Sequence, residues 1–135
     1  MSNFEKEFGS ARETFMNLIE NLDSEDFYRL YELFFCRFRL GPNEEIMSFQ
    51  EISDLKGLKV VHRCTYEEDF LSDSEIRSGC IIIMVDFNGN HIVLDGNHRI
   101  NTYMSSRPNL KTNVVLVPIR SFKKAPEVNL YPPIS

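Results

Sequence analysis

The residues best able to do chemistry lie together in the segment Asp95-Gly96-Asn97-His98-Arg99. The glycine lets the backbone approach a ligand closely or adopt a positive φ. The arginine offers a fork of donors suited to phosphate oxygens, and the histidine can donate a hydrogen bond or move a proton near neutral pH. The aspartate can orient the histidine, accept a sugar hydroxyl or hold a divalent metal ion through water. These residue types predict an anion-binding turn.

This turn stands between a predicted β-hairpin and a predicted helix. Residues 80–86 are mostly β-branched, Asn88-Gly89 is a strong hairpin turn, and residues 91–94 return as the second strand. A helical pattern then runs over residues 99–106. A helix N-terminus presents N–H groups without intrahelical partners and a positive dipole end, both of which favour phosphate or carboxylate. A glycine–asparagine turn before a helix is also common as a simple cap, so a structural role stays open.

The chain around the hairpin predicts a mixed α/β core. A capping box at residues 48–51 starts a short helix that ends at Gly57, and residues 58–64 follow as a strand. A second capping box at residues 72–75 predicts another short helix, and residues 114–119 predict the last strand. From residue 58 onward the expected order is strand, helix, two hairpin strands, helix and strand. A proline-rich tail, residues 122–135, is expected to be extended.

Two amphipathic helices are predicted ahead of this core, in residues 1–41. The second helix begins after Asp23 or Ser24 and stops at Gly41-Pro42. Its apolar stripe is strongly aromatic, which predicts core packing or, for part of the stripe, a surface for a protein partner. The stripes comprise Phe4, Phe8, Ala11, Phe15, Ile19 and Leu22 in the first helix and Phe27, Leu30, Tyr31, Phe34, Phe35 and Phe38 in the second.

Composition narrows the class of protein further. A chain of 135 residues that is 42% hydrophobic and 26% charged is expected to fold as one domain and to have no membrane span. No basic-then-apolar leader opens it, and its three cysteines form no CxxC pair, so we expect a cytoplasmic protein without a disulfide framework. The net charge of −5 disfavours nucleic-acid binding by bulk electrostatics. Residues 99–135, with six basic and one acidic side chain, still allow a local anion site, which Arg120, Lys123 and Lys124 would extend if the tail folds back beside the turn.

The stretch from Ile92 to Tyr103, with its DGNHR turn, resembles the signature of the ParB/sulfiredoxin-like superfamily. Members of that family place a G-x-x-R turn after a hairpin and at the start of a helix, within a small β-α-β-β-α-β core. The resemblance implies an α+β fold with this mixed-sheet core over residues 48–121 and the helical hairpin of residues 1–41 as an extension. It implies phosphate binding by Gly96, Asn97, His98 and Arg99. Asp95 matches the aspartate of the family's DGHHR variants.

Several positions depart from the family pattern. Asn97 stands where sulfiredoxin carries its reactive cysteine, so sulfinic reductase activity is not expected. Residues 65–70 lack a counterpart of ParB's arginine-bearing segment, and Gly79-Cys80-Ile81 lacks the usual proline at the hairpin entry. No helix-turn-helix domain follows the core, so a partition clamp is not expected either.

The resemblance predicts a protein that binds a nucleotide, such as ATP or CTP, or another phosphate ligand, with or without Mg²⁺. If it is an enzyme, which stays open, it hydrolyses or transfers a phosphoryl group. His98 would then move a proton, and an acid among Glu67, Glu68 and Asp69 would act as base or metal ligand, as in the family.

Two alternatives stay open. One is a non-catalytic interaction module of the inhibitor or immunity type, suggested by the acidic body and the aromatic helices. The other is a metal-dependent nuclease. No zinc site is expected, because the histidines and cysteines lack the spacing of known sites. The residues considered for such a site are His62, Cys64, Cys80, His91 and His98.

Overall fold

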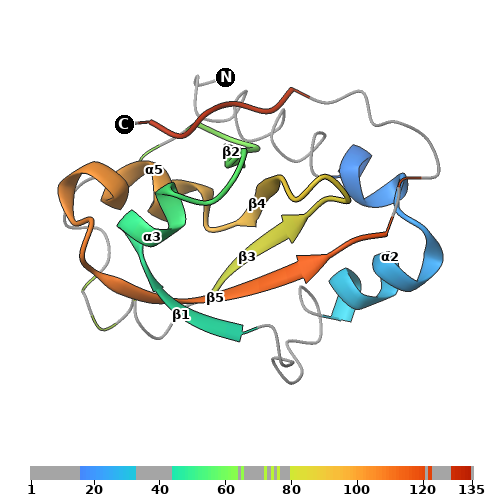
Figure 1. Ribbon diagram of the computed structural model, residues 1–135, viewed down its shortest axis with the longest axis horizontal. Helices are drawn as coiled ribbons and strands as arrows, with labels where there is room; N and C mark the ends of the chain where they lie inside the picture. The colour runs from blue at the N-terminus through green and yellow to red at the C-terminus, as the bar shows by residue number, and fades with distance from the viewer. Residues whose placement is uncertain are drawn as a thin grey trace, which may run out of the picture.

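The computed structural model describes residues 16–32, 44–63, 65, 72, 74, 76, 80–120, 122 and 129–134. In chain order its elements are α2 (Ser24–Tyr31), β1 (Glu44–Ser48), α3 (Phe49–Ser53), β2 (Lys59–Val60), β3 (Cys80–Val85), β4 (His91–Asp95), α5 (Asn97–Ser106) and β5 (Lys111–Pro118). Residues 16–20 are also helical. The fold is a small mixed α+β domain built on one five-stranded sheet (Figure 1).

The sheet has the strand order β1-β5-β3-β4-β2. The central hairpin pairs β3 with β4 in antiparallel fashion, and β5 runs parallel to β3 on its other side. The outer strands are β1, antiparallel to β5, and the two-residue β2, parallel to β4. Because α5 carries the chain from β4 across to β5, its N-terminus lies directly at the end of the hairpin.

The two faces of the sheet bury two separate apolar clusters, because successive strand residues point to opposite faces. The first face is covered by residues 16–22 and α2, and the second by α3 and α5. The first cluster includes Leu18, Leu22, Leu30, Ile82, Met84, Leu94, Val115 and Val117. The second includes Phe49, Ile52, Val60, Ile81, Ile83, Val93, Ile100 and Tyr103. The packing of Ile100 and Tyr103 against the second face fixes α5 and thereby its first turn.

Three local predictions are confirmed. The hairpin of β3 and β4 has the expected strands and the expected turn, in which Gly89 has a φ of 82°. The capping box at the start of α3 has both of its hydrogen bonds, between Ser48 and Glu51. Asp23 caps α2, since its carboxylate accepts the N–H of Asp26 at 3.1 Å.

Other boundaries were predicted wrongly. The expected strand over residues 58–64 is two residues long, because the N–H of Val61 donates to the side chain of Asn97 instead of continuing a ladder. The helix expected to reach Gly57 ends at Ser53, and Gly57 sits in the following turn with a φ of 58°.

The strand β1 was missed altogether. Its first three residues, Glu44 to Ile46, are exposed at the edge of the sheet, so the segment shows no clear apolar alternation. Acidic side chains on an edge strand are typical, since they discourage pairing with other chains. Two other elements start earlier than expected: α5 begins at Asn97 and β5 at Lys111.

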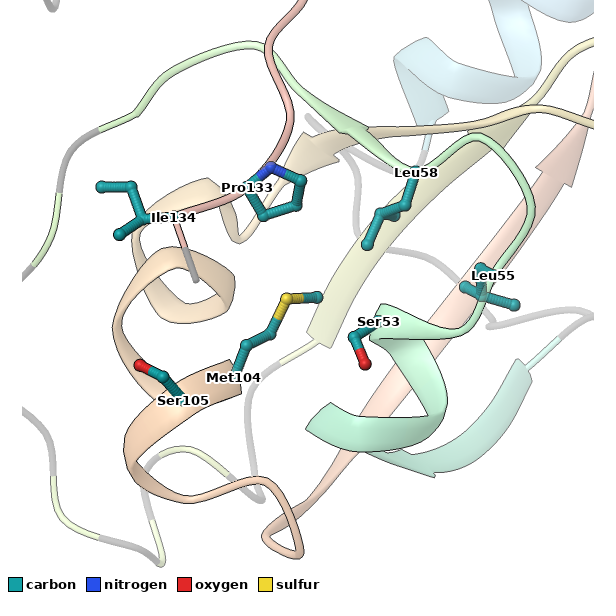
Figure 2. Close-up of a pocket in the computed structure, with 7 residues that line it drawn as sticks. All are labelled: Ser53, Leu55, Leu58, Met104, Ser105, Pro133 and Ile134. Atoms are coloured by element: carbon teal, nitrogen blue, oxygen red, sulfur yellow. The ribbon is translucent and has the colours of Figure 1, made fainter.

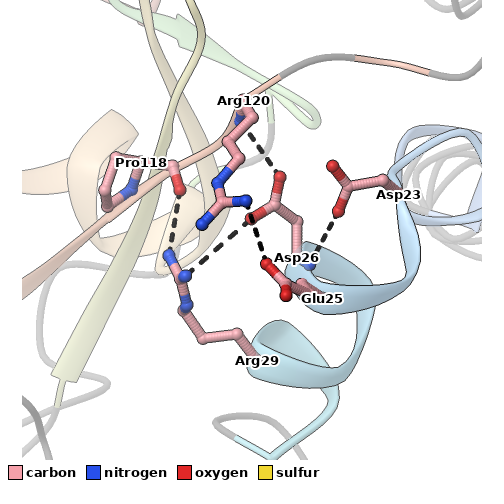
Figure 3. Close-up of polar contacts among 6 residues, drawn as sticks. All are labelled: Asp23, Glu25, Asp26, Arg29, Pro118 and Arg120. Atoms are coloured by element: carbon pink, nitrogen blue, oxygen red, sulfur yellow. Dashed lines mark hydrogen bonds and ion pairs between the residues drawn. The ribbon is translucent and has the colours of Figure 1, made fainter.

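Most of the aromatic stripe predicted for residues 1–41 lies outside the described residues. Within α2, Leu30 is buried as expected, but Tyr31 is exposed. The sequence pattern did not indicate that Asp26 is fully buried. Figure 3 shows its contacts with Arg29 and Arg120. Its carboxylate accepts the backbone N–H of Arg120 at 3.0 Å and lies 4.0 Å from the Arg29 guanidinium. Asp26 thus fastens α2 to the end of β5. No helix among the described residues is long and apolar enough to cross a membrane.

Candidate functional site

The N-terminus of α5 is built around Gly96, the residue between β4 and the helix. Gly96 is the N-cap of α5, has a φ of 97°, and supplies no side-chain hydrogen bond to the first turn. A Cβ at this position would lie 2.8 Å from Cγ1 of Ile81, a buried residue of β3. Both the positive φ and the close approach to β3 therefore require glycine here.

Asn97, which the family resemblance assigns to phosphate, uses its side chain within the fold. Its Oδ1 accepts the backbone N–H of Val61 at 2.8 Å and that of His62 at 3.4 Å. Its Nδ2 donates to the carbonyl of Leu94 at 3.3 Å. The amide therefore joins the start of α5 to the loop after β2. Because the side chain is bonded within the fold, Asn97 would contact a ligand through its backbone N–H.

His98 forms a pair with His62 that the sequence did not indicate. Nε2 of His98 and Nδ1 of His62 are 3.0 Å apart, a hydrogen bond in which one ring donates and the other accepts. The ring centroids are 5.0 Å apart, and His62 is buried whereas His98 is half-buried. The pair brings a ring from the loop after β2 to the first turn of α5, although the two residues lie 36 positions apart.

This environment lowers the pKa of His98 below its ordinary value of about 6.5. Burial, which disfavours the imidazolium, is the main cause, and the neighbouring His62 ring adds repulsion. His98 is therefore neutral at neutral pH. In this state each of its two nitrogens has one role, donor or acceptor.

The lowered pKa predicts that the protein loses stability on mild acidification. The unfolded chain binds a proton at His98 near pH 6.5 while the folded chain resists it, so this histidine's contribution is complete above about pH 6.5 and is lost as the pH falls towards the lower folded pKa. Urea unfolding between pH 7.5 and 5 measures this. The His98→Gln variant should show a shallower decline over the same range, and an unchanged decline would contradict the assignment.

Arg99 is anchored to the central strand of the sheet. Its Nη2 donates to the carbonyl oxygen of Cys80, the first residue of β3, at 2.7 Å, and the side chain is half-buried. This bond uses one of the five N–H donors of the guanidinium. The strand thus holds a positive charge next to the first turn of α5.

The remaining predicted site residues have different positions. Asp95 is the last residue of β4 and pairs with Ile82 across a register shift in the hairpin. The acids Glu67, Glu68 and Asp69 lie outside the described residues. Among the residues that are described, no three or more His, Cys, Asp or Glu side chains are grouped to hold a metal ion.

The basic residues after β5 were expected to extend the anion site if the tail folds back beside the turn. Arg120 instead pairs with Glu25 of α2, with Nη1 3.1 Å from the carboxylate (Figure 3). Lys123 and Lys124 lie outside the described residues. Of the basic residues predicted for the site, Arg99 is the one that the described part of the chain places at the turn.

Sequence reasoning missed two residues that shape this site. The sequence pattern places His62 in a predicted strand and among histidines and cysteines that lack the spacing of a zinc site, and it indicates no role for Asn101. Asn101 is buried, and its Nδ2 donates to the carbonyl of His62 at 2.7 Å. One signal was available, because Asn97 and Asn101 are four residues apart and therefore share a face of α5.

The chain was compared with protein-family models, with curated proteins and with solved structures, and none of the three comparisons gave a match.

Proposed function

We propose that this protein binds the phosphate groups of a nucleotide at the N-terminus of α5. The observation that carries the proposal is a ten-residue helix, Asn97–Ser106, whose N-cap Gly96 provides no side-chain hydrogen bond and whose first turn contains His98 and Arg99. Uncapped N–H groups and the positive end of the helix dipole favour an anion at this place. The resemblance of the DGNHR turn to the ParB/sulfiredoxin-like signature supports a nucleotide as the source of that anion.

The contacts of the site indicate a different part in phosphate binding for each of its residues. Gly96, whose missing Cβ would meet Ile81 in the core, allows the left-handed backbone that starts α5 and so places the N–H groups of its first turn. Arg99, held by the carbonyl of Cys80, would supply charge-assisted hydrogen bonds to phosphate oxygens. Asn97 would contribute its backbone N–H, because its side chain is bonded to the loop after β2. A preorganised set of donors of this kind loses little freedom when a ligand binds.

The histidine pair would supply proton transfer if the protein turns over its ligand. His98 is neutral at neutral pH and bonded to His62, so a proton taken up by His98 can be shared with the second ring. The proposed reaction is hydrolysis or transfer of a phosphoryl group of ATP or CTP. An acid among Glu67, Glu68 and Asp69 would act as the base or hold Mg²⁺, which would neutralise phosphate charge.

Replacing Arg99 with alanine should weaken nucleotide binding. Loss of a charge-assisted hydrogen bond costs about 1.5–3 kcal/mol, which corresponds to an affinity about tenfold to a hundredfold lower. Isothermal titration with ATP, CTP and ADP, with and without Mg²⁺, measures the change. Arg107→Ala is a matched control, because Arg107 lies at the other end of α5, over the ring of Tyr103. Failure of the wild-type protein to bind any of these nucleotides would refute the proposal.

A second candidate function is a non-catalytic module that binds a protein partner through α2. Tyr28 and Tyr31 are 64% and 46% exposed on this helix. The Tyr28 ring meets the half-buried Phe27 ring edge-on, with centroids 5.6 Å apart, and the Tyr31 ring stacks with it at 6.3 Å. Exposed tyrosines on a rigid helix are typical of interface anchors. This candidate predicts a complex that survives Arg99→Ala and is lost when Tyr28 and Tyr31 are both changed to serine.

A further inference from the structure

Residues 129–134, here called the strap, lie along the outer edge of β2, the last strand in the sheet order (Figure 1). The N–H of Val60 donates to the carbonyl of Tyr131 at 2.7 Å, and the N–H of Tyr131 donates back to the carbonyl of Val60 at 3.0 Å. Val60 is fully buried, so the strap satisfies both backbone groups of a residue that would otherwise lie at a sheet edge. The strap thus binds as a short added strand.

Two side-chain contacts hold the strap on either side of this bridge. Leu130 packs against the apolar cluster on the first face of the sheet. On the second face, Pro133 and Ile134 line a cavity of about 360 Å³ together with Leu58 and Met104 (Figure 2). The strap therefore makes contacts like those of a bound peptide: backbone pairing at Tyr131, and apolar side chains on both sides of the edge, Leu130 at one face and Pro133 and Ile134 at the other.

The strap is also connected to the histidine pair through one buried side chain. Oδ1 of Asn101 accepts the N–H of Ile134 at 3.0 Å, while Nδ2 of the same amide donates to the carbonyl of His62 at 2.7 Å. An amide that bonds at both ends fixes its orientation, because a flipped amide would lose both bonds. The strap therefore binds Val60 directly and His62 through Asn101, and these two residues are only two positions apart in the chain.

We propose that the edge of β2 and the side chain of Asn101 form a binding site for an extended Leu-Tyr-Pro-Pro-Ile peptide, whose Pro133 and Ile134 also wall one side of the adjacent cavity. This chain fills the site with its own strap, and the filled site positions His62 against His98. Asn101 is a positioning residue, because its side chain links the strap to the carbonyl of His62. The inference deepens the proposed function, since the histidine pair belongs to the proposed phosphate site. Its first test needs no nucleotide.

The test removes residues 129–135 and returns them as a synthetic peptide of the same sequence. Ring signals of His62 and His98 in NMR spectra should shift on deletion and return to their full-length positions as the peptide is titrated in. A peptide of scrambled order serves as the control and should leave the signals unchanged. Absence of peptide binding to the folded, shortened chain, or ring signals that do not move on deletion, would overturn the proposal.

A pair of full-length variants covers the case in which the shortened chain does not fold. Tyr131→Pro removes the N–H that donates to Val60, whereas Tyr131→Ala keeps it and removes only the side chain. Hydrogen exchange at the Val60 amide should be about tenfold faster in the proline variant than in the alanine variant, the effect of one lost hydrogen bond. The NMR ring signal of His62 should also shift in the proline variant relative to the alanine variant. Equal behaviour of the two variants would refute a backbone-bound strap.

The two proposals can fail separately. Nucleotide titrations that fail on the wild-type protein refute the phosphate site and leave the peptide and exchange results intact. If the nucleotide binds, Asn101→Asp, which keeps the acceptor for Ile134 and loses the donor to His62, should shift the His62 ring signal and lower the affinity. An unchanged ring signal in this variant would show that Asn101 does not position His62.

Discussion

Changing Gly96 to alanine should lower the free energy of unfolding by about 2–5 kcal/mol. An L-residue in the left-handed region costs about 1–2 kcal/mol, and Gly96 has a φ of 97°. In addition, the new Cβ would lie 2.8 Å from Cγ1 of Ile81, in a well-packed core where overpacking costs about 1–3 kcal/mol. Urea denaturation followed by circular dichroism measures the loss.

Gly89 in the hairpin turn provides a matched control. Its φ of 82° is similar, but a Cβ there would meet only the side chain of Lys56, at 3.8 Å. Gly89→Ala should therefore show the cost of the left-handed backbone alone, about 1–2 kcal/mol. Equal losses in the two variants would mean that the contact with Ile81 relaxes freely and that Gly96 is needed only for its backbone conformation.

The hairpin and the helix after it could be predicted because their signals are local. A β-branched run, an asparagine–glycine turn and a glycine before a helical pattern each act through neighbouring residues. The same holds for the capping box of α3, in which the bonded groups are three positions apart. These local signals placed Gly96 between the hairpin and a helix, although the helix begins at Asn97, two residues earlier than expected.

The parts of the site that could not be predicted depend on contacts between distant segments. Asn97 bonds to Val61, and Asn101 to His62, across separations of 36 and 39 residues. No periodicity in the sequence indicates that the loop after β2 packs against α5. The shortness of β2 has the same origin, because the Asn97 side chain takes the N–H that would have continued the strand.

The strand β1 and the pairing of the strap, which was expected only as part of an extended tail, were missed for a different reason. A strand buried on both faces is recognised by its apolar run, as in β3, but β1 has one buried residue and the residues of the strap are half-buried or exposed. The exposed Ile46 of β1 and the prolines of the strap resemble loop sequence. Their backbone pairing, with β5 for β1 and with Val60 for the strap, decides their structure.

Replacing Asp26 with alanine should lower the free energy of unfolding by about 2–3 kcal/mol, a loss similar to that at Gly96. The Asp26 carboxylate is fully buried and accepts the backbone N–H of Arg120 at 3.0 Å, and hydrogen bonds to charged groups contribute about 1.5–3 kcal/mol. The variant also leaves the Arg120 N–H without its acceptor and a small cavity under α2. Removal of the desolvation cost of the carboxylate offsets part of this loss.

A comparison with Glu25, the neighbouring acid on α2, distinguishes the effect of a buried carboxylate on stability from that of an exposed one. Its carboxylate lies 3.1 Å from Arg120 Nη1, but both side chains are about 70% exposed, so solvent screens the pair. Glu25→Ala should therefore cost less than about 0.5 kcal/mol under the same urea denaturation at pH 7. Asp26→Asn should fall between the two, because the amide oxygen still accepts the Arg120 N–H while the charge is lost. If Glu25→Ala and Asp26→Ala were equal, α2 would be held to β5 by its apolar contacts alone, and the contact of Leu30 with the first cluster would then fix the helix.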